Sequence, residues 1–92
     1  MHSVDLTWMD TLNPMGTTYS VYRAPGLCSG TPTFAKIATG VTILTYTDPS
    51  VTIGNFCYEV TATFNGLESA PSNMSQAIIL PSPPTGLLNT AK

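Results

Sequence analysis

The sequence has few charged residues. Only 9% of its 92 residues are charged, and the basic ones are Arg23, Lys36 and Lys92, against five acidic residues. An average soluble domain has about 25% charged residues. No basic stripe is available to neutralise phosphates or an anionic lipid surface. We therefore expect no nucleic-acid partner and no attraction to a charged membrane.

The residue groups that carry membrane spans or catalysis are also scarce. The longest apolar run is Ala77-Ile78-Ile79-Leu80, whereas a membrane-spanning helix takes about 20 residues. His2 is the single histidine, and the carboxylates form no spaced cluster of metal ligands. No glycine-rich phosphate loop is present. The sequence predicts no membrane insertion, no metal or other cofactor, and no enzymatic activity.

What the sequence does contain is a clear two-residue hydrophobic period in residues 55–64. Its large apolar residues are Phe56, Tyr58, Val60, Ala62 and Phe64. This alternation, followed by Asn65-Gly66, is typical of a half-buried strand that enters a tight hairpin. Glu59, Thr61 and Thr63 alternate with the apolar set, so we expect them to face water.

Shorter strands are predicted on either side of this one. Their expected ranges are 3–10, 18–23, 34–37 ending before Gly40, 43–47 ending at Asp48-Pro49, and 69–80 interrupted near Pro71. Fifteen threonines and eight serines suit the solvated faces of strands. The predicted class is all-β. The predicted core is Val4, Leu6, Trp8, Tyr19, Val21, Phe56, Tyr58, Val60, Ala62 and Phe64.

Five segments resemble fibronectin type III domains, in the form seen in bacterial extracellular proteins. They are residues 3–8 (SVDLTW), 19–23 (YSVYR), 45–48 (TYTD), 58–62 (YEVTA) and 67–73 (LESAPSN). The resemblance implies an immunoglobulin-like β-sandwich of two antiparallel sheets over residues 1–80, with strands B, C, C′, E, F and G. One departure is Phe56, which stands where the family usually has a tyrosine whose hydroxyl bonds the preceding corner.

The second departure is that strand A of the family is displaced to the C-terminus. Residues 81–92 resemble a Pro-rich linker followed by a strand-A-like segment. In a tandem array this segment opens the next repeat; in an isolated copy it folds back to complete its own sheet or inserts into a neighbour.

The two cysteines fit this likeness as a pair. In the implied fold, strands C and F are antiparallel neighbours, Cys28 follows the end of C, and Cys57 begins F on its solvent-facing side. A disulfide would close a loop of about 30 residues and stabilise the fold by about 3–4 kcal/mol. Two separate thiols are the alternative. We favour the disulfide, and with it an oxidising location, extracellular or on the cell surface.

Candidate contact residues are apolar side chains in expected loops and in the C-terminal segment: Leu12, Met15, Leu27, Leu87 and Leu88. A carbohydrate platform has weak support, because Tyr22 is the one tyrosine expected to face outward and the other aromatics are assigned to the core.

Three functions follow from these observations. The leading hypothesis is a non-catalytic spacer or scaffold module of a secreted or cell-surface multidomain protein, whose partners are its neighbouring domains. The first alternative is a self-assembling extracellular fibre subunit, in which residues 84–92 of one copy complete the sheet of the next. The second alternative is a small carbohydrate- or protein-binding module.

Overall fold

The computed structural model describes residues 2–91, which form seven strands and no helix. The strands are β1 (His2–Thr7), β2 (Thr18–Pro25), β3 (Ala35–Val41), β4 (Thr45–Val51), β5 (Gly54–Phe64), β6 (Leu67–Glu68) and β7 (Ser75–Ile79). Among residues 2–91 there is no helix long and apolar enough to cross a membrane. The predicted all-β class is confirmed.

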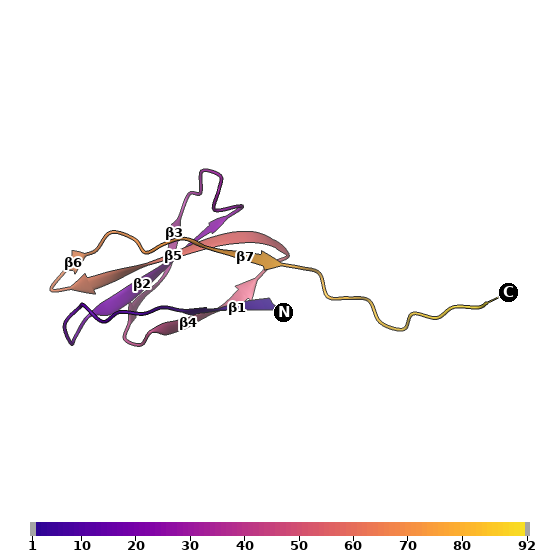
Figure 1. Ribbon diagram of the computed structural model, residues 1–92, viewed down its shortest axis with the longest axis horizontal. Coiled ribbons are helices and arrows are strands. Elements are labelled where there is room, and N and C mark those ends of the chain that lie inside the picture. The colour runs from indigo at the N-terminus through magenta and orange to yellow at the C-terminus, as the bar shows by residue number, and fades with distance from the viewer. Residues whose placement is uncertain (1, 92) are drawn as a thin grey trace.

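Two antiparallel sheets make up the fold, as predicted for a β-sandwich (Figure 1). The small sheet contains β1 and β4. The large sheet has the order β3-β2-β5-β6, and β7 pairs with the same edge of β5 as β6 does. The central strands β2 and β5 are therefore hydrogen-bonded on both edges, whereas β1 pairs with β4 alone among the described residues.

The strand registers define two ends of the sandwich. The hairpin end contains the Asn65-Gly66 turn, the start of β2, the end of β1 and the connection at residues 42–44. The disulfide end contains the start of β5, the end of β7 and the start of β1. Because β7 pairs antiparallel with β5, the chain leaves the sandwich at the disulfide end, the end at which β1 begins (Figure 1).

The expected central strand and its turn are confirmed. The predicted range 55–64 lies within β5, which is 11 residues long and is the longest of the described strands. Asn65 and Gly66 both have positive φ angles, 52° and 77°, as a two-residue type I′ hairpin turn requires. Asparagine and glycine adopt this conformation more readily than other residues, so the turn fixes the β5–β6 register.

The most deeply buried side chains belong to the two central strands. Val21 on β2 is 0% exposed and Tyr58 on β5 is 1% exposed, and Tyr19 is also buried. Six other predicted core residues are half-buried: Val4, Leu6, Trp8, Phe56, Val60 and Ala62. Phe64 was predicted in the core, but it is 38% exposed. It is the last residue of β5, at the hairpin end.

The outer face of β5 is less exposed than the alternation predicts. Thr61 and Cys57, both expected to face water, are buried. Thr61 donates a hydrogen bond to Glu68 on β6, and Cys57 is bonded to Cys28. Residues from outside β5 thus cover Thr61 and Cys57. The alternation within one strand does not report such partners.

Several predicted strand bounds were wrong: β1 ends at Thr7 and not near Asp10, β2 continues to Pro25, and residues 69–74 form no strand. β3 continues through Gly40, whose positive φ of 68° lies beside a register shift in the β2–β3 pairing. β4 continues through Pro49, which lies where the β1–β4 register shifts between Asp48 and Val51. A proline has no N–H to donate, so within sheets it occurs at edges and bulges. Both breaker residues lie in irregular pairings and do not end their strands.

The C-terminal segment does not fold back onto the sandwich. Residues 80–91, which we call the tail, contain no strand, and every residue is exposed. The tail extends away from the disulfide end along the longest axis of the molecule (Figure 1), which measures 71 Å. Of the three positions expected for this segment, pairing with its own sheet is therefore not seen here.

Candidate functional site

The predicted contact residues do not form one surface. Leu12 and Met15 lie in the loop before β2, at the hairpin end, and are 95% and 98% exposed. Leu27 follows β2 at the disulfide end, and Leu87 and Leu88 lie in the tail. These residues occupy three separate places, and two of the places are opposite ends of the sandwich.

Exposed apolar side chains are concentrated at the two ends of the sandwich. At the hairpin end they are Met9, Leu12, Met15, Ile43, Leu44, Phe64 and Leu67, and at the disulfide end Leu27, Ile53, Ile78 and Leu80; Met74, directly before β7, is also exposed but lies between the two ends. Single exposed apolar residues are normal on soluble proteins, but a concentration of them indicates a contact surface. Sequence reasoning found Leu12, Met15 and Leu27 and missed the others, because strand ends cannot be told from strand interiors by periodicity.

A groove runs along one side of the sandwich, between β1 and the β6–β7 connection. It has a volume of about 550 Å³, and its walls include Leu6 and Trp8 from the small sheet and Tyr58 and Val60 from β5. These four residues belong to the predicted core. Tyr58 is 1% exposed, whereas Leu6, Trp8 and Val60 are only half-buried, and no described strand closes this side of the sandwich.

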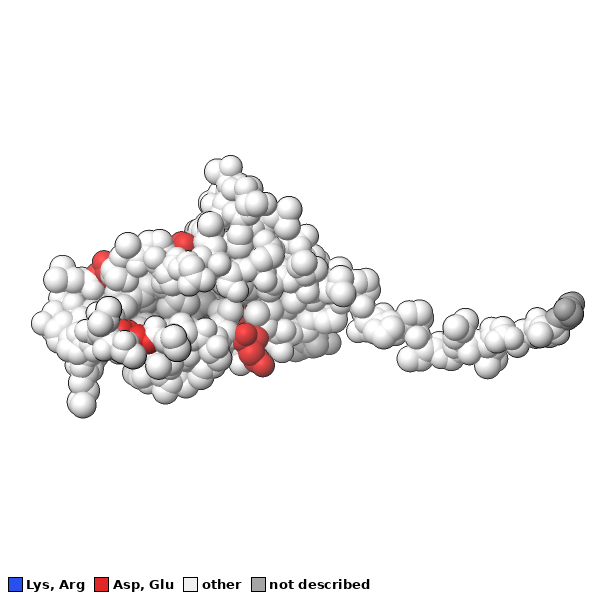
Figure 2. Space-filling model, in the orientation of Figure 1, with Lys and Arg blue, Asp and Glu red and all other residues white. Residues whose placement is uncertain are grey.

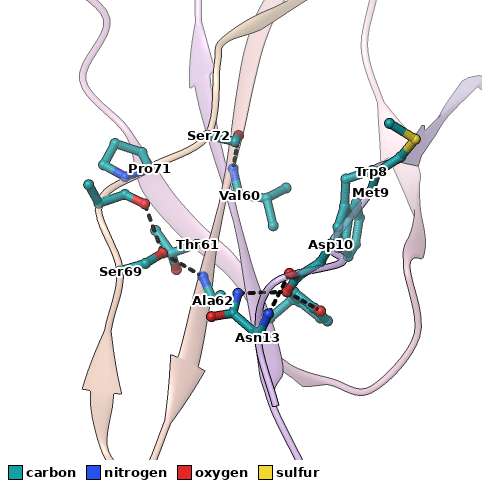
Figure 3. A pocket seen from close by; sticks show the side chains of 12 residues that line it. Trp8, Met9, Asp10, Asn13, Val60, Thr61, Ala62, Ser69, Pro71 and Ser72 are labelled. Atoms are coloured by element: carbon teal, nitrogen blue, oxygen red, sulfur yellow. Dashed lines mark hydrogen bonds between the residues drawn. The ribbon is translucent and has the colours of Figure 1, made fainter. Parts of the chain in front are cut away.

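A smaller hollow of about 190 Å³ shares part of this wall (Figure 3). Trp8 and Asp10 lie on one side of it, Val60 and Ala62 form its floor, and Pro71 lies on the opposite side. The two spaces share Trp8, Met9, Val60 and Ser72, so we treat them together as the side groove.

Trp8 is the aromatic centre of the side groove. Its ring contacts the ring of Tyr19 edge-to-face, with 5.5 Å between the ring centroids. Its indole N–H is buried and has no hydrogen-bond acceptor among the described residues. A buried donor without a partner costs about 1–3 kcal/mol, and tryptophan N–H groups usually find a partner when buried.

The far wall of the side groove is built by serine hydroxyls. Ser69 and Ser72 accept hydrogen bonds from the backbone N–H groups of Ala62 and Val60, at 2.9 and 3.0 Å. In return their own N–H groups donate to the carbonyls of the same two residues, at 2.7 and 2.8 Å. Pro71 lies between the two serines. The serines therefore replace regular strand pairing over residues 69–74 and keep the segment beside β5.

Asp10 holds the wall of the side groove opposite Pro71 in place. Asp10 accepts hydrogen bonds from the Tyr19 hydroxyl at 2.6 Å, the Asn13 side-chain amide at 2.7 Å, and the N–H groups of Leu12 and Asn13. The bonds from Tyr19 and Asn13 lower the pKa of Asp10 to about 2. The same contact with Asp10, with some burial, raises the pKa of Tyr19 to about 12. This network fixes the loop that follows β1.

A second carboxylate joins the two sheets. Asp48 on β4 is buried, and its Oδ2 accepts hydrogen bonds from Arg23 Nη1 at 2.8 Å and from the Tyr58 hydroxyl at 2.7 Å. Hydrogen bonding to Asp48 raises the pKa of Arg23. Burial, followed by the bond to Asp48, raises the pKa of Tyr58. We call these three residues the inter-sheet cluster.

A second aromatic residue of β5 contacts the inter-sheet cluster. The Arg23 guanidinium lies over the ring of Phe56, 5.5 Å from the centroid. The next inward-facing residue on β5, Tyr58, supplies the hydroxyl that bonds β4. The alternation in residues 55–64 predicts Tyr58 in the core but not its polar partner, because Asp48 precedes Pro49 and this pair indicates a turn.

A third carboxylate lies on the outer face of the large sheet. Glu68 Oε2 accepts hydrogen bonds from the hydroxyls of Thr61 and Tyr22, both at 2.5 Å. These two bonds lower the pKa of Glu68. Lys36 lies over the Tyr22 ring, 5.6 Å from its centroid. The one tyrosine expected to face outward thus belongs to a structural network.

The disulfide expected between Cys28 and Cys57 is present, with the two Cα atoms 5.2 Å apart. Gln76 on β7 supports it: the side chain accepts a hydrogen bond from the Cys28 N–H at 2.6 Å and donates one to the Phe56 carbonyl at 3.0 Å. The bridge and the glutamine together attach the long β2–β3 connection to the disulfide end of the large sheet.

The described residues contain no group of three or more histidine, cysteine or carboxylate side chains that could hold a metal ion. The three carboxylates with several hydrogen-bond donors, Asp10, Asp48 and Glu68, are each engaged by tyrosine, threonine, asparagine or arginine side chains. Their arrangement positions loops and sheets.

Comparison with known proteins gives one informative similarity. The chain is 42% identical over 79 residues to an amylopullulanase of Thermoanaerobacter thermohydrosulfuricus, a match that covers 80% of this chain and 5% of that protein. No family model matches the chain, and no solved structure matches it. What this chain resembles is thus a small part of a much longer protein, about one-twentieth of its length.

Proposed function

We propose that this chain is a non-catalytic spacer module of the fibronectin type III kind, placed end to end with other domains in an extracellular protein. The observation that carries the proposal is the concentration of exposed apolar side chains at the two ends of the sandwich. A module that contacts its neighbours at both ends needs apolar surface there, and the flanks of its sheets can remain polar.

The strand order supports the family assignment. In the nomenclature of that family, β1 and β4 correspond to strands B and E. Strands β3, β2 and β5, with β6 and β7 together, correspond to C′, C, F and G. The disulfide supports an oxidising location outside the cytoplasm. The similarity to 5% of a long amylopullulanase supports a module within a larger protein.

The hydrogen-bonding of the carboxylates supports a role without catalysis. A general acid or base needs a titratable group that is free to exchange a proton with a substrate. Asp10, Asp48 and Glu68 instead accept hydrogen bonds that join loops and sheets within the module. Incubation of the chain with amylose and with pullulan should release no reducing sugar, and neither polymer should retard it in affinity electrophoresis. Sugar release would contradict the proposal, and retardation without release would favour the binding-module alternative.

The spacer role can be tested with two copies joined in one polypeptide, residues 1–92 followed directly by residues 1–92. Small-angle X-ray scattering should give an extended particle with a narrow distribution of distances between the two sandwiches. A matched variant with Pro81, Pro83 and Pro84 of the first copy replaced by glycine should broaden that distribution, because proline-rich linkers are stiff. A broad distribution in the parent tandem would contradict a fixed spacer.

A further inference from the structure

We propose that the side groove is a binding site for an extended strand, and that its occupant is the tail of a second copy of this chain, residues 84–91. The strand lies antiparallel to β1 and extends the small sheet to three strands. This inference is independent of the spacer role, since the groove and the tail are features of the single module.

The first support is the hydrogen-bonding capacity of β1. This strand pairs with β4 on one edge, and no described residue pairs with its other edge. An unpaired strand edge presents a row of N–H and C=O groups, which is a template for another extended chain. β1 is also the strand whose residues alternate regularly between half-buried and exposed, so its inner side chains face the groove side of the core.

The second support is the chemistry of the groove itself. Leu6, Trp8, Tyr58 and Val60 line it, and its volume of about 550 Å³ lies beside the free edge of β1. A strand on that edge would point every second side chain into this space. Trp8 is half-buried and lies on the same wall, so a strand in the groove would cover the part of its side chain that is still exposed.

The third support is the composition of the tail. Leu87 and Leu88 are 92% and 88% exposed, and residues 81–91 contain no charged side chain. Figure 2 shows the described part of the tail free of both charge colours. Eight extended residues span about 26 Å, enough to follow the six residues of β1, which span about 20 Å. The segment is therefore uncharged, carries two adjacent leucines and is long enough for the groove.

Strand direction selects the source of the tail. β1 runs from the disulfide end to the hairpin end, so an antiparallel partner has to enter at the hairpin end. The chain's own tail leaves at the disulfide end. To enter correctly it would have to run back about 20 Å, using about six of its residues, and then reverse again. Pro81, Pro83 and Pro84 oppose such a reversal directly after the sandwich.

A second copy meets the same requirement without a reversal. The tail continues straight along the long axis of its own sandwich (Figure 1) and reaches the hairpin end of a copy placed in line with it. There it enters the groove in the antiparallel direction. The contact joins two different surfaces, so it repeats from copy to copy and produces an open linear array.

The experiment uses the full chain, with Trp8 as its single tryptophan reporter. Light scattering after size exclusion should show a mass that rises with protein concentration, and Trp8 emission should shift to the blue over the same range. An excess of a peptide of residues 81–92 should dissociate the larger species, because the peptide occupies the groove but carries no groove of its own. The Trp8 emission should remain blue-shifted, because the groove is still filled.

Substitutions at two adjacent residues distinguish strand docking from unspecific apolar association. In an extended strand only one of Leu87 and Leu88 points into the groove. Of Leu87→Asp and Leu88→Asp, one should weaken association about tenfold or more, the cost of losing one buried leucine, and the other should have a small effect. Equal loss in both variants would overturn the proposal in favour of unspecific apolar association.

Two other results would also overturn it. If the chain stays monomeric and the peptide leaves the Trp8 emission unchanged at millimolar concentration, the groove does not bind this segment. If the emission is already blue-shifted in a monomer and one of the tail substitutions abolishes the shift, the tail completes its own sheet. Neither result affects the spacer role, which the tandem scattering experiment tests separately.

Discussion

The two sheets of this protein are stabilised by different means. In the large sheet, β2 and β5 are paired on both edges, carry the most deeply buried side chains, and are attached to the long β2–β3 connection by the disulfide. In the small sheet, β1 has one paired edge and half-buried side chains. The large sheet is complete within one chain. The small sheet depends on the inter-sheet cluster and, in our proposal, on a strand from another copy.

The largest expected effect concerns the large sheet. Replacing both cysteines with alanine (Cys28→Ala, Cys57→Ala) should lower the free energy of unfolding by about 3–4 kcal/mol, because a loop of about 30 residues is then free in the unfolded chain. Urea titration of the variant and the parent measures the difference. A loss below about 1 kcal/mol would mean that the disulfide contributes little and that packing alone maintains the large sheet.

The next prediction concerns the link between the sheets. Asp48→Ala leaves the buried Tyr58 hydroxyl without an acceptor and Arg23 without its ion pair. Because Arg23 is partly exposed, we expect a loss of about 2–3 kcal/mol, below the range for a fully buried pair.

Asp5→Ala is the matched control in the same sheet. Asp5 is exposed and accepts one hydrogen bond, from Thr47, so its removal should cost about 0.5 kcal/mol or less. Thermal unfolding of the two variants compares an inter-sheet carboxylate with a surface one. Equal destabilisation would show that the inter-sheet cluster does not hold the small sheet in place.

A smaller effect is expected at the wall of the side groove. Ser69→Ala and Ser72→Ala each remove the acceptor of a β5 N–H group, and each should cost about 1–2 kcal/mol. Ser75→Ala is the control, because the Ser75 hydroxyl is exposed and has no hydrogen bond among the described residues. Urea titration measures the free energy of unfolding of each variant. If all three variants have the same stability, the Ser69 and Ser72 hydroxyls do not replace strand pairing.

The smallest effect is a pH dependence. Asp10 has a folded-state pKa of about 2, below its ordinary value of 3.8, so its carboxylate stabilises the fold above about pH 4 and loses this contribution as the pH falls toward 2. Tyr19, raised to about 12, contributes below pH 10 and loses its contribution as the pH rises toward 12. Asp10→Asn should flatten the melting-temperature profile at the acid end. An unchanged acid limb would show that other carboxylates, such as Glu68, control it.

The sequence predicts β5 and its hairpin turn better than β3 and β4, for physical reasons. The alternation in residues 55–64 and the Asn65-Gly66 turn report local geometry, so they identify β5 and its turn correctly. Gly40 and Pro49 are breakers in a regular strand, but bulged pairings accept them. Their strands were therefore predicted too short.

The site residues were harder to find than the strands. The burial of Thr61 and the polar role of Asp48 depend on partners distant in sequence, which no local pattern reports. The exposure of Phe64 depends on where the sandwich stops. The side groove itself results from a strand edge without a partner, which is a property of the assembled sheets. The tail, by contrast, was identifiable from its prolines and its adjacent leucines.

The most direct test of the account is amide hydrogen exchange of β1 and β5, measured in the full chain at a concentration low enough for it to be monomeric, with and without an excess of the peptide of residues 81–92. Exchange in β5 should be slow in both samples, since the strand is paired on both edges. Exchange in alternate residues of β1 should be fast alone and slowed at least about tenfold with the peptide, as their free N–H groups gain partners. Unchanged exchange throughout β1 in the presence of the peptide would contradict the claim that the small sheet is completed by a strand from another copy.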